Sequence, residues 1–137
     1  MLTEREFACD AHTPGAARTF ATDTLRQEMG RSLSPDVRYD VELIVSELVT
    51  NAVRAGSDTV IVCVGVQGGK VVVRVTDRAS GWPEQRETHI DDAGGRGLPL
   101  VSALSAAWGV RLADTGKVVW AEVAVPKLIA AGDSTNP

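Results

Sequence analysis

Aromatic residues and cysteines are both scarce in this sequence. Phe, Trp and Tyr make up only 4% of the 137 residues, so a core must be built from Val, Leu, Ile and Ala. There are two cysteines, Cys9 and Cys63; nothing in the sequence supports a disulfide between them, and a reducing compartment is expected. The two histidines, His12 and His89, are scattered and no cysteine cluster accompanies them, which argues against a zinc site.

The sequence also has no excess of positive charge and no long apolar run. The formal net charge is −4, whereas a nucleic-acid-binding protein normally presents a basic face. The longest apolar run, residues 60–66, is far too short to cross a bilayer. The N-terminal segment MLTEREFACD contains no apolar stretch of the kind found in signal peptides. We therefore expect a cytoplasmic protein that binds neither nucleic acid nor membrane.

The sequence does contain enough apolar material for one folded domain. Hydrophobic residues make up 44% of the chain, well above the content of a disordered chain. Helix start and stop signals and Val-rich runs predict helices and strands in a definite order. In chain order they are helices over 13–30 and 34–56, strands over 59–66 and 71–76, a helix over 97–108, and strands over 109–114 and 117–125.

This order of elements predicts an α+β fold. We expect a two-layer sandwich in which helices pack on one face of a mixed, mostly antiparallel sheet. We also expect a flexible N-terminus over residues 1–9, a single domain over 10–126 and a flexible tail over 127–137. Residues 78–96 show no clear period and are predicted to form a functional loop.

The helix over 34–56 carries polar residues beside its buried apolar stripe. Glu47 and Asn51 are one turn apart among Val, Leu and Ala, and Arg54 continues the same edge. An amide oxygen suits a hard cation such as Mg²⁺, and a carboxylate can accept a proton. A solvated helix edge, where charged residues pair along the helix, explains the same pattern, and this helix alone favours that explanation.

Two further segments point to a ligand. Asp77 ends a Val-rich strand. A carboxylate buried there needs a hydrogen-bond donor, and an amine of a ligand would serve. The alternative is that Asp77 belongs to a common turn. In the segment GGRGL (94–98), glycines lead directly to the predicted start of a helix. Backbone N–H groups and the helix dipole form an anion site at such a place, although a glycine-capped loop is equally consistent with the pattern.

Taken together, these segments resemble the GHKL ATPase superfamily, whose members share the Bergerat nucleotide-binding fold. ELVTNA (47–52) matches its N box, DRASG (77–81) its G1 box and GRGL (95–98) its G2 box. The resemblance spans roughly residues 10 to 126. The helix before the N box and the closing segment WGVRLADTGKVVWAEV (108–123) resemble more narrowly the RsbW-like anti-sigma-factor serine/threonine kinases.

The resemblance implies roles for single residues. Asn51 would coordinate the Mg²⁺ that bridges the phosphates of ATP, and Glu47 would be the general base that activates the acceptor hydroxyl. Asp77 would accept a hydrogen bond from the adenine amino group. Gly81 would let the backbone pass close to the adenine.

The resemblance also implies a group of residues at the phosphates. Gly95 and Gly97 would bring backbone amides to the phosphates, and Leu98 completes the G2 box beside them. Arg54 and Arg96 are placed to offset phosphate charge, an inference that depends on their positions in the sequence rather than on the family.

Two residues depart from the superfamily's pattern. The G1 box usually reads DxGxG, and Ala79 stands where its first glycine is expected. Many relatives also carry a Thr before the final strand, near the Asp that contacts adenine, and here we expect Val118 at that place. Leaving a polar partner of that hydroxyl unpaired costs about 1–3 kcal/mol, so weak ATP binding is expected.

The resemblance implies an ATP-binding regulatory protein, and an enzyme is favoured over a pure binding module. As an anti-sigma-factor serine/threonine kinase, it would phosphorylate a STAS-type anti-anti-sigma protein and switch between that partner and a sigma factor. The alternatives are a partner-binding module that uses ATP or ADP only as a structural or switching ligand, and a degenerate relative that binds no nucleotide. A homodimer is expected from the resemblance alone. The sequence does not identify the sigma factor, the antagonist or the upstream signal.

Overall fold

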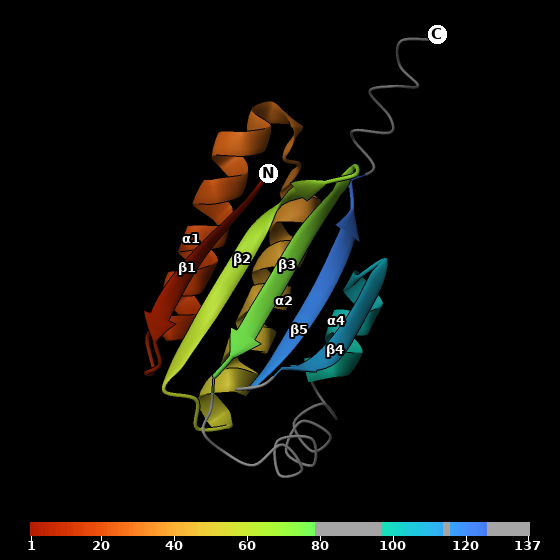
Figure 1. Cartoon of the computed structure of the whole chain (residues 1–137). Coiled ribbons are helices and arrows are strands. Elements are labelled where there is room, and N and C mark those ends of the chain that lie inside the picture. The colour runs from red at the N-terminus through yellow and green to blue at the C-terminus, as the bar shows by residue number, and fades with distance from the viewer. Residues whose placement is uncertain (79–96, 114–115, 126–137) are drawn as a thin grey trace, which may run out of the picture.

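The structure is a computed structural model, and it describes residues 1–78, 97–113 and 116–125. Within these ranges the chain forms a five-stranded antiparallel sheet with helices packed on one of its faces (Figure 1). The predicted α+β class and two-layer arrangement are therefore confirmed. The sheet is antiparallel at every pairing, rather than mixed.

A Val-rich hairpin forms the centre of the sheet. Strands β2 (Thr59–Gln67) and β3 (Lys70–Asp77) pair antiparallel, as their Val-rich runs predict. The turn between them places Gly68 and Gly69 at φ +61° and +76°. Glycine enters this left-handed region without strain, so the two glycines make the tight turn possible and set the register of the hairpin.

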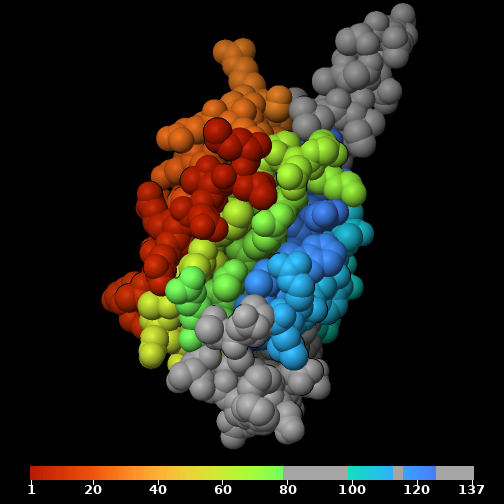
Figure 2. Space-filling view, viewed as in Figure 1, coloured from red at the N-terminus to blue at the C-terminus, as the bar shows by residue number. Residues whose placement is uncertain are grey.

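Three more strands extend the sheet on both sides of this hairpin. β5 (Gly116–Ala124) pairs with β3, and β4 (Ala107–Ala113) pairs with β5 at one edge. β1 (Leu2–Ala8) pairs with β2 at the other edge, which gives the order β1-β2-β3-β5-β4. Figure 2 shows these strands side by side on the surface, with none of the helices of the described ranges in front of them.

The helices cover the opposite face of the sheet. In chain order they are α1 (Thr13–Met29), the short 3₁₀ turn η1 (Gly30–Ser32), α2 (Pro35–Arg54) and α4 (Gly97–Leu104). α2 lies centrally and contacts α1, α4, β3 and β5. Its start follows the sequence signal: the Ser34 hydroxyl accepts a hydrogen bond from the Val37 N–H at 3.2 Å.

The core lies between the helices and the inner face of the sheet, and it is almost entirely aliphatic. Phe20 is the only aromatic side chain among its buried residues in the described ranges. Side chains that are completely buried include Leu25, Ile44, Val45, Val49, Val60, Val62, Val64, Val71 and Val73. The scarcity of aromatic residues in the sequence is thus matched by a core of interlocking Val, Leu, Ile and Ala.

The N-terminal residues correct one expectation. Where the sequence predicts flexibility over residues 1–9, the structure has the edge strand β1, paired with β2 along its length. Phe7 holds it to the core through an edge-to-face contact with Phe20, whose ring centroid lies 6.0 Å away. The Arg5 guanidinium lies over the same ring at 5.0 Å. Because most of the strand's residues are polar, the sequence shows no apolar pattern there that would predict a strand.

The last predicted helix is shorter than expected. α4 ends at Leu104, whereas the sequence predicts helix to residue 108. The chain turns there because the Ala106 N–H donates to the Glu122 carbonyl of β5 at 2.7 Å, which opens the β4 pairing. Trp108 then packs against the core from β4.

Some predicted features lie outside the described residues. They are the C-terminal tail over 127–137 and the sites Ala79, Gly81, Gly95 and Arg96. Among the helices of the described ranges, none combines the length and the apolar character that crossing a membrane requires.

Candidate functional site

Four elements meet at one end of the molecule, the lower end in Figure 1. α2 and β3 end there, and α4 and β5 begin there. Four of the predicted site residues are carried by the first two elements: Glu47, Asn51 and Arg54 by α2, and Asp77 by β3. Because α2 contacts β3, β5 and α4, residues far apart in the sequence gather at this end.

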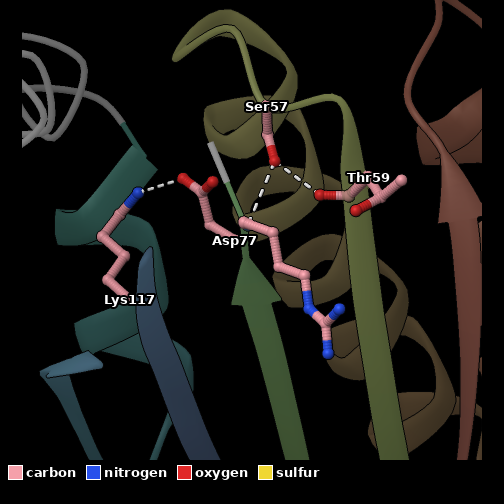
Figure 3. A network of polar contacts seen from close by, with 5 residues as sticks. Ser57, Thr59, Asp77 and Lys117 are labelled. Carbon is pink, nitrogen blue, oxygen red and sulfur yellow. Dashed lines mark hydrogen bonds and ion pairs between the residues drawn. The ribbon is translucent and has the colours of Figure 1, made fainter. Parts of the chain in front are cut away.

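Asp77 is paired with a lysine that the sequence analysis did not single out. It lies directly opposite Lys117 in the β3–β5 register. The Lys117 Nζ donates to Asp77 Oδ2 at 2.5 Å, and both side chains are only 2% exposed (Figure 3). The buried carboxylate thus has a donor from its own chain. Such a pair is held together because separating it would leave two charges away from water.

Glycine allows β5 to begin this close to Asp77. A Cβ atom placed on Gly116 would lie 1.6 Å from the Asp77 carbonyl oxygen, so no side chain can be accommodated there. The close approach of the two backbones brings the next residue, Lys117, into line with the carboxylate. Gly116 therefore helps the Asp77–Lys117 ion pair to form.

Ser57 ties the neighbouring strand ends together, as Figure 3 shows. Its hydroxyl donates to the Thr59 carbonyl at 2.5 Å and accepts from the Arg78 N–H at 3.2 Å. The side chain is buried and links the start of β2 to the residue that follows Asp77. This contact holds the end of β3 in place, and the sequence offered no signal for it.

The charge of Asp77 also affects the pKa of the Cys9 thiol. Burial raises the pKa of the Cys9 thiol, the Asp77 carboxylate raises it further, and a hydrogen bond with the Ser57 side chain acts in the opposite direction. Cys9 therefore stays protonated at neutral pH, which suits a packing residue rather than a nucleophile.

Asn51 faces the ion pair across a small cavity. The cavity holds about 10 Å³, room for roughly one water molecule. It is lined by Leu48, Asn51, Ala52, Val75, Asp77, Lys117 and Val119. Asn51 is 8% exposed, and nothing in the part of the chain that the structure describes makes a hydrogen bond to its side-chain amide. A nearly buried amide of this kind is available to a ligand.

Glu47 and Arg54 lie on α2 on either side of Asn51 in the sequence, and neither lines the cavity. Glu47 is one turn before Asn51 and partly exposed, and Arg54 at the end of α2 is exposed. Across residues 1–78, 97–113 and 116–125, no hydrogen bond or ion pair engages the Glu47 carboxylate. It can therefore accept a proton from a group that approaches from solvent.

Val118 is not where the sequence analysis expected it. It pairs with Thr76 rather than with Asp77, and alternation along β5 turns it to the outer face of the sheet. There it lines a groove with Val72, Arg74 and Trp120. The expectation that Val118 replaces a hydroxyl of the base pocket is therefore wrong: Lys117 occupies the inward position beside Asp77.

The glycine-rich segment is only partly visible in the described residues. Gly97 is the first residue of α4, which packs against α2. Gly81, Gly95 and Arg96 lie outside the described residues, and the Leu98 side chain does too. The start of α4 is thus placed at the same end of the molecule as Asn51 and Asp77 (Figure 1).

The residues present fit a magnesium nucleotide in their chemistry. The Asn51 amide oxygen is a ligand that Mg²⁺ accepts, and Asp77 is an acceptor for an amino group. No cluster of three His, Cys, Asp or Glu side chains occurs in the described ranges, so most oxygen ligands would come from phosphates and water, as is usual for Mg²⁺. The cavity is too small for a base, so a base could enter only if Lys117 moved.

Comparison with known families agrees with this arrangement. The family model described as a histidine kinase-like ATPase domain matches residues 7–123, which is most of the chain. The match includes Glu47, Asn51, Asp77 and Lys117. A comparison with curated proteins finds no match. The family match supports an ATP-binding domain, and the chain belongs to the family of histidine kinase-like ATPase domains.

Proposed function

We propose that this protein binds Mg-ATP between the C-terminal half of α2, the end of β3 and the start of β5. The observation that carries the proposal is the Asn51 amide, which is nearly buried, lines a cavity with Asp77 and has no partner in the described ranges. A ligand that completed its hydrogen bonds would be favoured. Asn51 would hold Mg²⁺ together with phosphate oxygens, and Asp77 would accept from the adenine amino group.

We further propose that the protein is a serine/threonine kinase. Glu47 would take the proton of the acceptor hydroxyl while that oxygen forms its bond to the γ-phosphorus and ADP departs. The partial exposure of Glu47 leaves space for a hydroxyl carried by a protein substrate. Arg54 would offset phosphate charge, and bound Mg²⁺ would supply further charge neutralisation.

The proposed partners follow from the resemblance of the closing segment, residues 108–123, to RsbW-like kinases. The substrate would be a STAS-type anti-anti-sigma protein, and the competing partner a sigma factor. The protein would act in the cytoplasm as a homodimer and would control transcription by exchanging one partner for the other.

A second candidate function is favoured by the Asp77–Lys117 pair. The acceptor proposed for adenine already has a buried donor, and the adjoining cavity holds only about 10 Å³. These features suit a partner-binding module in which nucleotide binds weakly, as a structural or switching ligand, or does not bind.

Calorimetric titration with Mg-ATP and Mg-ADP tests nucleotide binding. We expect micromolar affinity in the native protein and no measurable binding in Asn51→Ala, because the variant loses the magnesium ligand but keeps its packing. Gln27→Ala, which shortens an exposed amide on α1, is the matched control and should bind normally. Native-like affinity in a folded Asn51→Ala protein would contradict the proposed site.

Transfer of labelled γ-phosphate separates the kinase from the binding module. Incubated with purified STAS-domain proteins, the native protein should label one of them. Glu47→Gln should reduce the rate by about 10²–10⁴-fold, because it removes the base without changing the side-chain shape. Glu42→Gln on the same helix, whose carboxylate accepts from Thr22, is the control. ATP binding without transfer to any STAS-domain protein would favour the binding module.

A further inference from the structure

Among the described residues, the Lys117 ammonium has more donors than partners. It carries three N–H groups, and one of them donates to Asp77 Oδ2. No second acceptor for it is found in the part of the chain that the structure describes, although the side chain is 2% exposed. Unmet donors on a buried ammonium are unfavourable, so a ligand acceptor placed against it would be stabilised.

Lys117 and Asp77 line the same cavity side by side, an acceptor next to a donor (Figure 3). Adenine presents the complementary pair on one edge, because its exocyclic amino group donates and the adjacent ring nitrogen N1 accepts. We propose that Lys117 is a base-reading residue whose ammonium donates to adenine N1 while Asp77 accepts from the amino group. This inference depends on the proposed nucleotide binding at this site.

The pair would also reject the closest competitor of adenine. Hypoxanthine reverses the order on this edge, with a carbonyl oxygen where adenine has its amino group and an N–H at N1. Its carbonyl oxygen would face the Asp77 carboxylate, an acceptor against an acceptor. Its N–H would face the Lys117 ammonium, a donor against a donor, so neither contact could form a hydrogen bond.

Entry of a base requires Lys117 to shift, because the cavity holds about 10 Å³. A lysine can do this because its unbranched side chain has four rotatable bonds. Its ammonium can keep the hydrogen bond to Asp77 while the side chain bends. Lys117 would thus close the empty pocket and read the base in the filled one.

Titration of the native protein with Mg-ATP and with its 1-deaza analogue tests the proposal, because the analogue has a C–H in place of N1. We expect the analogue to bind at least about tenfold more weakly, since it leaves the ammonium donor unpaired. Purine riboside triphosphate, which keeps N1 but lacks the amino group, probes the Asp77 contact separately and should also bind more weakly.

The outcomes separate this inference from the proposed function. Equal binding of ATP and 1-deaza-ATP by the native protein would overturn the role of Lys117 and leave ATP binding intact. Absence of ATP binding would overturn both. Equal binding combined with tighter ATP binding in Lys117→Met would show that Lys117 only fills the pocket.

Variants provide the second measurement. Lys117→Met should bind ATP and 1-deaza-ATP equally, because the donor that distinguishes them is gone. Lys70→Met is the matched control, since Lys70 pairs with Glu122 across the same two strands, β3 and β5, on the exposed surface. It should keep the native preference for ATP; a Lys117→Met protein that folds and keeps that preference would contradict the proposal.

Discussion

At the scale of single residues, the burial of Asp77 and Lys117 has a large energetic consequence. The two charges lie at the meeting point of β3 and β5, each 2% exposed. An ion pair of this kind contributes little net stability as a whole, because desolvation offsets the attraction. Removal of one partner is different, since the remaining buried charge loses the ion pair that offsets its desolvation.

We therefore expect Lys117→Met to lower the free energy of unfolding by about 3–5 kcal/mol. The double variant Asp77→Asn/Lys117→Met, which buries neither charge, should lose clearly less. Urea denaturation of the native, single and double variants measures the difference as a double-mutant cycle. A double variant as unstable as Lys117→Met would mean that shape, rather than charge, holds this corner of the molecule together.

At the scale of elements, the start of β5 decides which side chain meets Asp77. Gly116 allows the backbone to pass against the Asp77 carbonyl, and the following residues alternate inward and outward from there. A displacement of β5 by one residue would turn Lys117 outward and bring Val118 to the cavity.

Gly116→Ala tests this dependence. The added methyl group would lie 1.6 Å from the Asp77 carbonyl oxygen, so β5 must move away from β3. We expect a loss of roughly 1–3 kcal/mol in unfolding free energy, together with loss of nucleotide binding. Gly15→Ala in α1 is the control, because its methyl group would meet nothing closer than the Arg18 guanidinium at 3.5 Å. Equal behaviour of the two variants in thermal unfolding and ATP titration would refute the close-approach argument.

The elements that could be predicted from sequence are those with strong local signals. The QGGK turn and the Ser34-Pro35 helix start act within a few residues, and both appear in the structure as predicted. β1 could not be predicted, because its seven residues are mostly polar and only Phe7 is tied to the core. Its stability comes from pairing with β2, which lies more than fifty residues away in the sequence.

The residues of the candidate site also divide into those that the sequence could predict and those that it could not. Glu47, Asn51 and Asp77 could be selected because each stands out against its own helix or strand. Lys117 could not, because its importance depends on the β3–β5 register, which brings together residues forty positions apart. Local patterns do not contain that information, and the mistaken placement of Val118 has the same origin.

At the scale of the whole molecule, helices and sheet form two layers, and none of the helices in the described ranges lies against the outer face of the sheet (Figure 2). This face is not purely polar: Val72, Arg74 and Trp120 line a groove together with Glu122. The resemblance to RsbW-like kinases leads us to expect that two copies associate.

Static light scattering measures this directly. We expect a mass near twice the 14.5 kDa of one chain at concentrations above the dissociation constant of the dimer. Dilution should return the mass toward that of a single chain. A monomer at the highest accessible concentration would reject the homodimer while leaving nucleotide binding unaffected.

The edge strand β1 has a consequence for how such molecules meet. Thr3, Glu4, Arg5 and Glu6 are all exposed along it. An open sheet edge is a template on which another molecule's strand can add, and a row of charged side chains makes that addition unfavourable. Crowded copies that collide at this edge will therefore separate again instead of joining their sheets into a growing fibre.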